Sequence, residues 1–238
     1  MNAQVPKQVL AVIPARGGSQ GIPRKNLAPL GGIPLLAWTI RAAQGSHRIT
    51  RVLVSTEDDE IAALARAEGA GVPFVRPQAL AKGDVHSVHT VLHALAWLKE
   101  HERYEPEIVI MLLPTSPLRT AVQIDEAVAL FVQHEPPSVV SVTDLGKQLL
   151  HLRRIENGVL KPLVASGDLN IQRQDSEPLY ALNGSIYVTS SARLNAQKTF
   201  HQEGAIPYRM PFRSSVDINE PFDLTLAECL LQAGPSAS

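Results

Sequence analysis

Cysteine, net charge and long apolar runs are all scarce in this 238-residue chain. The single cysteine, Cys229, cannot form an intramolecular disulfide, and it excludes a zinc site built from several cysteines. The longest strongly apolar run, residues 108–113, is far shorter than the ~20 residues that a membrane-spanning helix needs. The N-terminal segment lacks the apolar region of a secretory signal, so we expect a cytoplasmic protein with no membrane partner.

Positive and negative charges nearly cancel. The chain has 22 lysines and arginines against 23 aspartates and glutamates, a formal net charge of −1. This balance argues against a general polyanion binder, so we expect no nucleic-acid partner, although a local basic loop can still bind phosphate. Hydrophobic residues make up 45% of the chain, which is ample for a core. Because no internal repeat or low-complexity linker interrupts it, we expect a single domain over residues 1–238.

Short apolar runs alternate with helical periodicity through the first 145 residues. This β-α-β-α order predicts an α/β fold with a doubly wound, mostly parallel sheet. The expected strands and helices follow from runs of apolar residues and from spacings of three and four residues. Strands are expected at residues 9–13, 52–55, 72–75, 108–113 and 139–142, and helices at residues 35–43, 59–68, 88–98 and 124–131.

The alternation ends near residue 145. Two strands are expected beyond it, at residues 149–155 and 181–189, with a polar stretch between them that contains glycine and proline. We interpret residues 145–190 as a small β-rich insertion that contributes to sugar binding and to a dimer contact.

The C-terminal segment returns to the helical pattern. A short strand is expected at residues 216–218, followed by a helix at residues 220–232. Leu224, Ala227 and Leu231 recur at helical spacing, so they are expected to form the buried face of that helix.

The sequence AVIPARGGSQGIPRKN, at residues 11–26, carries the strongest functional signal. Its glycines allow several backbone N–H groups to converge on an anion, and Arg16, Arg24 and Lys25 add positive charge. The spacing matches neither GxxxxGK[ST] nor GxGxxG, which excludes a Walker A loop and a dinucleotide fingerprint. A flexible turn with solvated basic residues is the alternative, but its place after the first strand favours a phosphate-binding loop.

Further motifs accompany this loop over almost the whole chain. They are LVSTEDDEIA at 53–62, RPQALAKGD at 76–84, LPTSPLR at 113–119, RQD at 173–175, NGSIYV at 183–188 and VDIN at 216–219. With the loop, they resemble the acylneuraminate cytidylyltransferases, which are the CMP-sialic acid synthetases and their bacterial relatives. The resemblance implies a Rossmann-like nucleotidyltransferase fold, Mg²⁺ dependence and usually a homodimer. It also implies a reaction of CTP with a 2-keto-3-deoxy sugar acid that yields the CMP-sugar and pyrophosphate.

The resemblance assigns CTP binding to the loop and to two residues beyond it. Attack on the α-phosphate builds negative charge on the departing pyrophosphate, which fixed cations offset. Asn26 is alternatively a turn residue, and Ser87 alternatively belongs to the first turn of a helix. His86 and His89, which flank Ser87, are interpreted as solvated or packing residues. The expected nucleotide-binding residues are Ala15, Arg16, Gly17, Gly18, Ser19, Lys25, Asn26, Arg76 and Ser87, of which Arg16 and Lys25 are also expected to be catalytic.

The sugar acid is expected to meet Arg173, Asn183 and Tyr187, which match family positions in the RQD and NGSIYV motifs. An arginine binds a carboxylate in bidentate fashion, which suits Arg173 to the acid group of the sugar. Tyr187 alternates with Ile186, so one of the two is expected to fill the core. Arg119, at the end of PTSPLR, is interpreted as a structural ion-pair partner.

Three departures from the family pattern fall on the sugar side. Leu113 stands where sialic-acid enzymes commonly have glutamine, and Ala181 stands where some have a second arginine. LGKQLLH, at residues 145–151, replaces the usual HPxK segment. None of these departures touches the triphosphate loop. We infer that the nucleotide chemistry is kept and that the acceptor differs from ordinary N-acetylneuraminate.

The VDIN motif carries the metal prediction. Family members often have Asp-x-Asp here, with both side chains aimed at Mg²⁺, an ion that prefers oxygen ligands. Asp217 can bind the ion and can accept the proton of the sugar hydroxyl, so it is the third expected catalytic residue. Asn219 offers only a neutral carbonyl oxygen. Alternatively, Asn219 caps the helix that begins at Glu220 and Pro221.

The sequence therefore predicts a Mg²⁺-dependent cytidylyltransferase that acts on a nonulosonic acid of the sialic, legionaminic or pseudaminic type. No Cys, Ser or His has an obvious nucleophile–base arrangement, which fits a single displacement of pyrophosphate by the anomeric 2-hydroxyl. One alternative is a cytidylyltransferase for an eight-carbon acid such as 3-deoxy-octulosonate. The other is a catalytically silent CTP-binding homologue, which the asparagine at position 219 favours.

Overall fold

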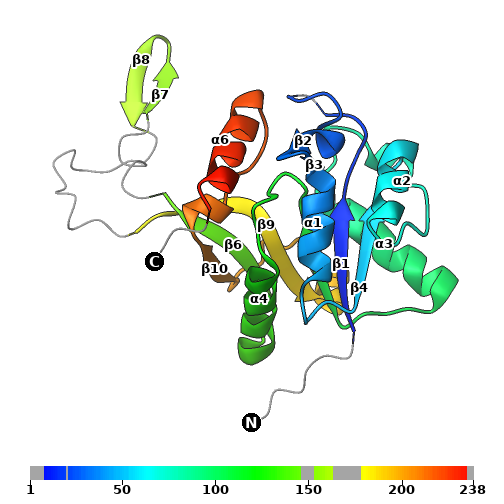
Figure 1. Cartoon of the computed structure of the whole chain (residues 1–238). Coiled ribbons are helices and arrows are strands. Elements are labelled where there is room, and N and C mark those ends of the chain that lie inside the picture. Colours follow the sequence, from blue (N-terminus) through cyan, green and yellow to red (C-terminus); the bar gives the residue numbers. More distant parts are fainter. Residues whose placement is uncertain (1–7, 20, 146–152, 163–177, 235–238) are drawn as a thin grey trace.

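A six-stranded sheet forms the centre of the molecule (Figure 1). The computed structural model describes residues 8–19, 21–145, 153–162 and 178–234. The strands are, in their order across the sheet, β10 (Ile206–Met210), β6 (Ser138–Asp144), β9 (Tyr180–Ser190), β5 (Ile108–Leu112), β1 (Val9–Pro14) and β4 (Arg51–Ser55). Two hairpins stand apart from this sheet, one of β2 (Pro29–Leu30) with β3 (Ile33–Pro34), the other of β7 (Arg153–Glu156) with β8 (Val159–Pro162).

Five of the six strands run in the same direction, so the predicted mostly parallel sheet is confirmed. β1 pairs in parallel with β4 and β5, and β10 pairs in parallel with β6. β9 runs antiparallel between β5 and β6 and is hydrogen-bonded to both. β9 is therefore part of the central sheet, and the expected β-rich insertion does not extend to residue 190. In the described chain the insertion consists of the β7–β8 hairpin, and its dimer contact stays a prediction.

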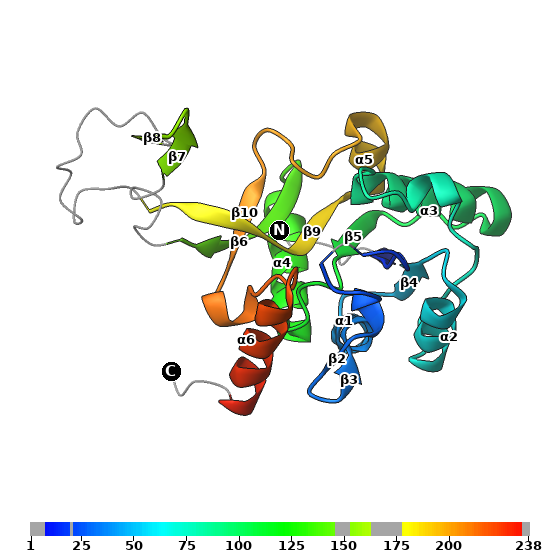
Figure 2. The ribbon, with the colours of Figure 1, turned by 90° about the horizontal axis from the view of Figure 1, so that it is seen from above.

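Helices cover both faces of the sheet (Figure 2). They are α1 (Leu35–Gln44), α2 (Asp59–Ala67), α3 (Ser87–Glu102), α4 (Ala121–His134), α5 (Ser191–Gln197) and α6 (Pro221–Gln232), with 3₁₀ helices at Lys25–Leu27, Gln78–Leu80 and Phe212–Ser214. The bounds of α1, α2, α4 and α6 agree with the expected helices to within a turn, and α3 continues for a turn beyond its expected end. No helix in the described part of the chain has the length and apolarity of a membrane span.

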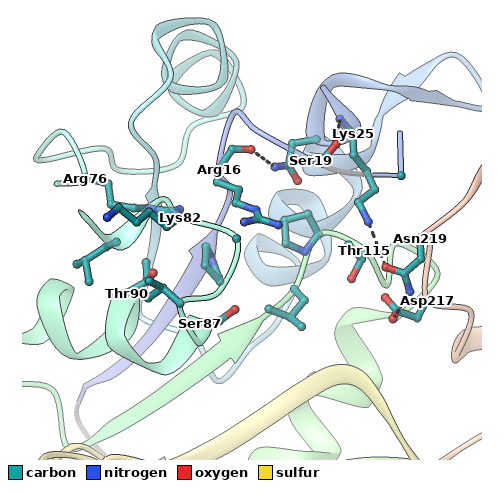
Figure 3. Close-up of a pocket in the computed structure, with 18 of the residues that line it drawn as sticks. Arg16, Ser19, Lys25, Arg76, Lys82, Ser87, Thr90, Thr115, Asp217 and Asn219 are labelled. Atoms are coloured by element: carbon teal, nitrogen blue, oxygen red, sulfur yellow. Dashed lines mark hydrogen bonds between the residues drawn. The ribbon is translucent and has the colours of Figure 1, made fainter. Parts of the chain in front are cut away.

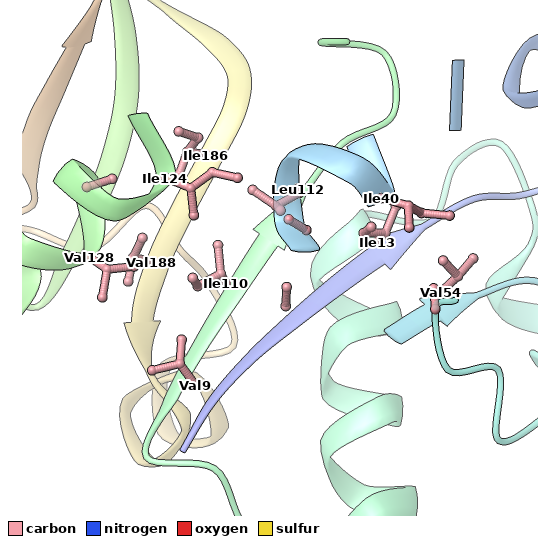
Figure 4. Close-up of a cluster of buried hydrophobic side chains, with 14 of the residues drawn as sticks. Val9, Ile13, Ile40, Val54, Ile110, Leu112, Ile124, Val128, Ile186 and Val188 are labelled. Carbon is pink, nitrogen blue, oxygen red and sulfur yellow. The ribbon is translucent and has the colours of Figure 1, made fainter. Parts of the chain in front are cut away.

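The largest core lies between the sheet and the helices α1, α2 and α4 (Figure 4). Ile13 and Ile110 from the central strands meet Ile40 of α1 and Ile124 of α4, and all four side chains are fully buried. A second core packs α3 against the opposite face, around Leu98. Burial on both faces explains why the central strands are apolar throughout.

A third, smaller core positions the segment that carries the predicted metal ligands. Val216 and Ile218 pack with Leu30 and with Ala227 of α6, as the helical pattern predicted. Burying alternate residues leaves Asp217 and Asn219, which lie between and after them, available to the opposite side.

Two expected strands are wrong. Residues 72–75 form no strand; an isolated bridge pairs Gly71, the residue before them, with Leu53. Pro73 lacks the N–H that a strand needs, which explains the failure. Residues 216–218 are extended without ladder pairing; Ile218 makes one backbone bond there, to the carbonyl of Thr115 at 2.7 Å. Helix α5 and the strands β2, β3, β8 and β10 were not expected from the sequence. Most of the strand expected at 149–155 lies outside the described residues.

Candidate functional site

A cavity of about 550 Å³ opens at the carboxyl ends of β1 and β5 (Figure 3). Ligands of open α/β sheets bind at this edge, beyond the ends of the parallel strands. Its walls come from the glycine-rich loop (residues 15–26), the segment before α3, the first turn of α3, the turn after β5 and the segment before α6. The lining residues that carry charge are Arg16, Lys25, Arg76, Lys82, Asp217 and Glu220.

Internal hydrogen bonds hold the glycine-rich loop in place. The side chain of Asn26, which is mostly buried, donates to the carbonyl of Arg16 at 2.8 Å. The hydroxyl of Ser19 donates to the carbonyl of Ile22 and accepts the backbone N–H of Lys25 at 3.4 Å. Asn26 therefore fixes the backbone at Arg16 while it also lines the cavity.

Gly17 and Gly18 do not line the cavity, although both were expected to bind the nucleotide. The backbone N–H of Gly17 donates to Oε1 of Glu57 at 2.7 Å, behind the loop. Ala15 is also buried, and its N–H donates to the carbonyl of Ser55 at 3.0 Å. In this arrangement the loop meets the cavity through side chains more than through these amides.

Of the three basic residues expected in the loop, two line the cavity and one does not. Arg24 forms ion pairs with Asp58 at 2.9 Å and with Glu60 at 3.1 Å, outside the cavity lining. Arg16 and Lys25 line the cavity from the loop side. The positive charge that the loop gives to the cavity is therefore theirs.

Lys25 reaches across from the loop to the segment before α6 (Figure 3). Its Nζ donates to the carbonyl of Ile218 at 2.7 Å and to Oδ1 of Asn219 at 3.2 Å. Burial lowers the pKa of Lys25 below its ordinary value, and the charge of Arg16 acts in the same direction. The carboxylates of Asp217 and Asp223 oppose that decrease in pKa. The ammonium group thus lies between a positive loop and a negative segment.

The segment before α6 is ordered by its own hydrogen bonds. Nδ2 of Asn219 donates to Oδ2 of Asp217 at 2.8 Å. The backbone N–H groups of Asn219 and Glu220 both donate to Oδ2 of Asp223, each at 2.8 Å. Glu220 is the N-cap of α6 and forms a capping box with Asp223, with Pro221 next in the chain. The alternative role expected for Asn219, capping this helix, is therefore wrong.

The donor set at Asp217 and Asn219 fits a magnesium ion that arrives with a nucleotide. It offers one carboxylate and one amide oxygen, and no group of three or more His, Cys, Asp or Glu side chains forms a metal site among the described residues. Mg²⁺ is commonly held by one or two carboxylates together with substrate phosphates and water. Asp217 would hold the ion. Oδ1 of Asn219 already accepts from Lys25, which makes it the weaker ligand.

Arg76 lies on the opposite side of the cavity and is only 3% exposed. It donates to the carbonyl and, at 3.3 Å, to the hydroxyl of Ser55, and its Nε is 3.8 Å from Oε2 of Glu57. Burial lowers the pKa of Arg76 to about 10, against the opposing effect of Glu57, so the group stays charged at neutral pH. Ser87 is the first residue of α3 and lines the same cavity.

A second cavity of about 350 Å³ adjoins the first and shares Ser87 and Leu113 with it. Tyr187 lines this cavity and is 7% exposed. Burial raises the pKa of its hydroxyl, and the charge of Asp217 adds to the increase. The remaining lining residues are His86, Val88, His89, Met111, Lys198, Thr199, Phe200 and His201.

The other described residue that was expected to bind the sugar lies elsewhere. Asn183 is buried and lines neither cavity. Its side chain accepts from the hydroxyl of Ser141 at 2.5 Å, and it donates to the hydroxyl of Ser215 at 2.9 Å and to the sulfur of Met210 at 3.4 Å. Arg173 lies outside the described residues.

Within the described part of the chain, Arg119 makes hydrogen bonds in place of the expected ion pair. The side chain is buried, and its guanidinium donates to the carbonyls of Ser185 and Leu113 at 2.7 and 2.6 Å and to the hydroxyl of Thr39 at 2.6 Å. Burial lowers the pKa of Arg119 to about 9. The side chain therefore ties the turn after β5 to β9 and α1, at the point where the two cavities meet.

Lys82 lines the cavity from the segment before α3, although no function was expected for it from the sequence. The close-up shows Lys82 on the same side of the cavity as Arg76 (Figure 3). A basic residue within the RPQALAKGD motif was the available signal. With Lys82, the cavity is lined by four basic and two acidic side chains, a balance that suits an anionic ligand.

Replacing Gly21 by alanine is expected to lower the kcat/KM of the expected cytidylyl transfer about 100-fold. The added Cβ would force the glycine-rich loop away from the segment before α6. That Cβ would lie 2.0 Å from the carbonyl oxygen of Asn219, a backbone atom that cannot swing aside. Steady-state kinetics and a thermal melt would check this expectation. The control is Gly71→Ala, whose Cβ would come no closer than 3.4 Å to Val52. Equal kinetics for Gly21→Ala and wild type would contradict the close contact.

Comparisons with known proteins agree with this geometry. A family model described as cytidylyltransferase matches residues 10–209. CMP-N,N'-diacetyllegionaminic acid synthase of Legionella pneumophila is 35% identical over 233 residues, which cover 97% of this chain and 99% of that protein. N-acylneuraminate cytidylyltransferase of Escherichia coli is 32% identical over 228 residues, which cover 94% of this chain. The matched region is 52% of the E. coli protein, so the chain spans about half of its length.

Solved structures extend the likeness to the fold. A CMP:2-keto-3-deoxy-manno-octonic acid synthetase complexed with CTP superposes with a TM-score of 0.73 at 14% identity, covering 96% of this chain and all of that one. A 4-diphosphocytidyl-2C-methyl-D-erythritol synthase from Anaerococcus prevotii superposes with a TM-score of 0.63 at 13% identity, covering 95% and 96% of the two chains. These two likenesses support the Rossmann-like fold alone. The family model and the full-length match to the Legionella protein go further: this chain belongs to the cytidylyltransferase family of nucleotidyltransferases.

Proposed function

We propose that the protein is a Mg²⁺-dependent cytidylyltransferase that joins CTP to a nonulosonic acid and releases pyrophosphate. The observation that carries the proposal is the pair of adjoining cavities, one lined by basic side chains and the other reached past Ser87 and Leu113. The first would hold CTP and the second the sugar acid. The proposal includes a cytoplasmic homodimer, which rests on the resemblance stated from the sequence.

The basic side chains would divide the nucleotide between them. Arg16 and Lys25, at the loop, suit the triphosphate, whereas Arg76 and Ser87 lie on the far side of the cavity, where the cytidine would sit. Arginine offers a planar fork to phosphate oxygens and lysine offers a point charge, so the two residues of the loop are complementary. Asn26 supports this end of the site by holding the carbonyl of Arg16.

The reaction needs a proton acceptor and a way to stabilise the departing pyrophosphate. Asp217 lies beside the cavity at the end nearest Lys25, and it would accept the proton of the 2-hydroxyl as that oxygen attacks the α-phosphate. Arg16 and Lys25 would offset the charge that develops on the leaving group. Mg²⁺ bound at Asp217 would supply further neutralisation of phosphate charge. The attacking group is the hydroxyl of the sugar, so this single displacement needs no nucleophilic side chain.

The acceptor we favour is a diacetylated nonulosonic acid of the legionaminic type. The match covers 99% of the Legionella relative, and the name of that relative states the CMP-activated form of such an acid as its product. Leu113, Met111 and Val88 give the second cavity an apolar wall, on which an acetyl or methyl group can pack. Among the described residues that were expected to bind the sugar, Tyr187 lines this cavity. The match to the octonic acid synthetase supports only the fold, so an eight-carbon acceptor remains the alternative.

Pyrophosphate release tests the proposal directly. The protein would be incubated with CTP, Mg²⁺ and a panel of nine- and eight-carbon sugar acids, with ATP, GTP and UTP as nucleotide controls. We expect release with CTP and a nine-carbon acid only, loss of release in EDTA and recovery when Mg²⁺ is restored. Release with an eight-carbon acid alone would establish the alternative acceptor. Tight CTP binding without release from any acid would identify a catalytically silent homologue.

A further inference from the structure

Glu57 lies behind the glycine-rich loop, on the turn that joins β4 to α2. Its side chain is 10% exposed and lines neither of the two cavities. Oε1 accepts the backbone N–H of Gly17 at 2.7 Å. Oε2 is 3.8 Å from Nε of Arg76 and has no hydrogen-bond partner among the described residues. One buried carboxylate thus contacts both the loop and the arginine on the opposite side of the first cavity.

The residues on either side of Glu57 fix its backbone. The carbonyl of Thr56 accepts the backbone N–H of Arg76 at 2.8 Å. Asp58 caps α2 and pairs with Arg24 of the loop at 2.9 Å. Gly17 fits closely against this turn, because a Cβ at Gly17 would lie 2.7 Å from Oδ2 of Asp58. The turn after β4 therefore meets the loop over several contacts, with Glu57 at their centre.

The direction of the Gly17 N–H determines whether Glu57 competes with a bound phosphate group or supports the loop from behind. An amide that faced the cavity would let a phosphate group compete with the carboxylate for the same hydrogen. Gly17 does not line the cavity, and its amide faces Glu57 instead. The carboxylate therefore supports the loop from behind. Its charge also raises the pKa of Arg76 against the effect of burial, which favours the protonated guanidinium.

We propose that Glu57 is a positioning residue for CTP, which holds the glycine-rich loop through the Gly17 amide and orients Arg76 on the other side of the cavity. The inference rests on the proposed function, because it takes CTP as the ligand of the first cavity. Without the carboxylate, a partly buried N–H loses its partner and Arg76 loses its acidic neighbour, so both sides of the nucleotide site lose support.

Calorimetric titration with CTP and steady-state kinetics on the full chain test the proposal. Glu57→Ala is expected to weaken CTP binding about tenfold, because it removes a hydrogen bond to a charged group and leaves a partly buried donor unpaired. Glu57→Gln keeps an acceptor for Gly17 but loses the charge near Arg76, so its affinity should lie between those of Glu57→Ala and wild type. Asp59→Ala is the matched control, since Asp59 follows closely in the chain and is exposed in the first turn of α2.

The split between substrates separates positioning from general damage to the fold. The KM for CTP should rise in both Glu57 variants while the KM for the sugar acid stays at the wild-type value. Wild-type or tighter CTP binding by Glu57→Ala would overturn the proposal, as would a parallel rise in both KM values with a lower melting temperature. If Glu57→Ala fails to fold, Glu57→Gln decides the matter by the same criteria. Failure of wild type to bind CTP would refute the proposed function instead.

Discussion

Replacing Lys25 by alanine is expected to lower kcat about 10³-fold, because a fixed cation beside the leaving pyrophosphate is lost. Lys25 joins the loop to the segment that carries Asp217, through bonds of 2.7 and 3.2 Å to Ile218 and Asn219. Its removal therefore takes away a charge and a contact between two walls of the site. The KM for CTP should also rise, since the triphosphate would meet one cation fewer. Initial rates of pyrophosphate release over a range of CTP concentrations, at a saturating concentration of the sugar acid, measure both parameters.

The pH dependence of wild type gives a second reading of the same group. Burial lowers the pKa of Lys25 from its ordinary value, so the ammonium loses its proton at a lower pH than a solvated lysine does. Because the protonated form is the active one, kcat should fall as the pH rises through this lowered pKa. Lys25→Arg keeps the charge at alkaline pH, so that decrease should disappear in this variant.

A matched lysine controls for the loss of positive charge as such. Lys99 is 67% exposed on α3 and pairs with Glu105, far from the cavity lining. Lys99→Ala should retain wild-type kinetics, and melting temperatures would show that both alanine variants fold. A kcat within about threefold of wild type for Lys25→Ala would show that Lys25 does not act in the catalytic step. Each tenfold change in rate is about 1.4 kcal/mol, so a threefold change is far smaller than the loss expected for a catalytic cation.

The largest expected effect on stability comes from Arg119→Ala, which should lower the free energy of unfolding by about 3 kcal/mol. The guanidinium satisfies the carbonyls of Ser185 and Leu113 and the hydroxyl of Thr39, all in a buried place. Alanine leaves these acceptors unpaired and opens a cavity among them. Burying the arginine costs desolvation free energy in the folded protein. The alanine variant does not have this cost, which offsets part of the loss of stability. Urea unfolding with a fixed m value measures the difference.

Arg41 supplies the comparison for this variant. It makes a two-point contact with Glu68 on the surface, with both distances at 2.8 Å, and its side chain is 51% exposed. Solvent screens such a pair, so Arg41→Ala should leave the urea midpoint almost unchanged. Arg119→Lys should fall between Arg119→Ala and wild type, because one ammonium cannot reproduce the fork. A loss below about 1 kcal/mol in Arg119→Ala would show that water replaces the missing donors.

Most helices and central strands could be predicted because their apolar patterns lie within single short segments of the sequence. Helices α1 and α4 carry long apolar faces, and β5 is a continuous apolar run, so periodicity alone located them. The glycine-rich loop was recognisable for a similar reason, since its chemistry is contained in one continuous stretch. The missed elements are short: α5 has seven residues, and β10 has five and contains Pro207.

The site was harder to predict where it depends on contacts between distant segments. Asn183 bonds to Ser141, Met210 and Ser215, partners that no spacing in the chain reveals. The contact of Glu57 with the loop could not be predicted for the same reason. Glu57 and Gly17 are 40 positions apart in the chain, and only the fold brings them together. The N-cap at Glu220 was missed because asparagine is the better cap in general, whereas Asp223 completes a capping box with glutamate here.

The position of β6 in the sheet sets an order for folding during synthesis. Both of its neighbours, β9 and β10, follow it in the chain, whereas β1, β4 and β5 can pair with one another as soon as Leu112 has been made. At roughly 5–20 residues per second on a ribosome, β6 therefore waits several seconds for its first partner. The half of the sheet that carries the glycine-rich loop can form before the other half, with β9 the strand that joins them.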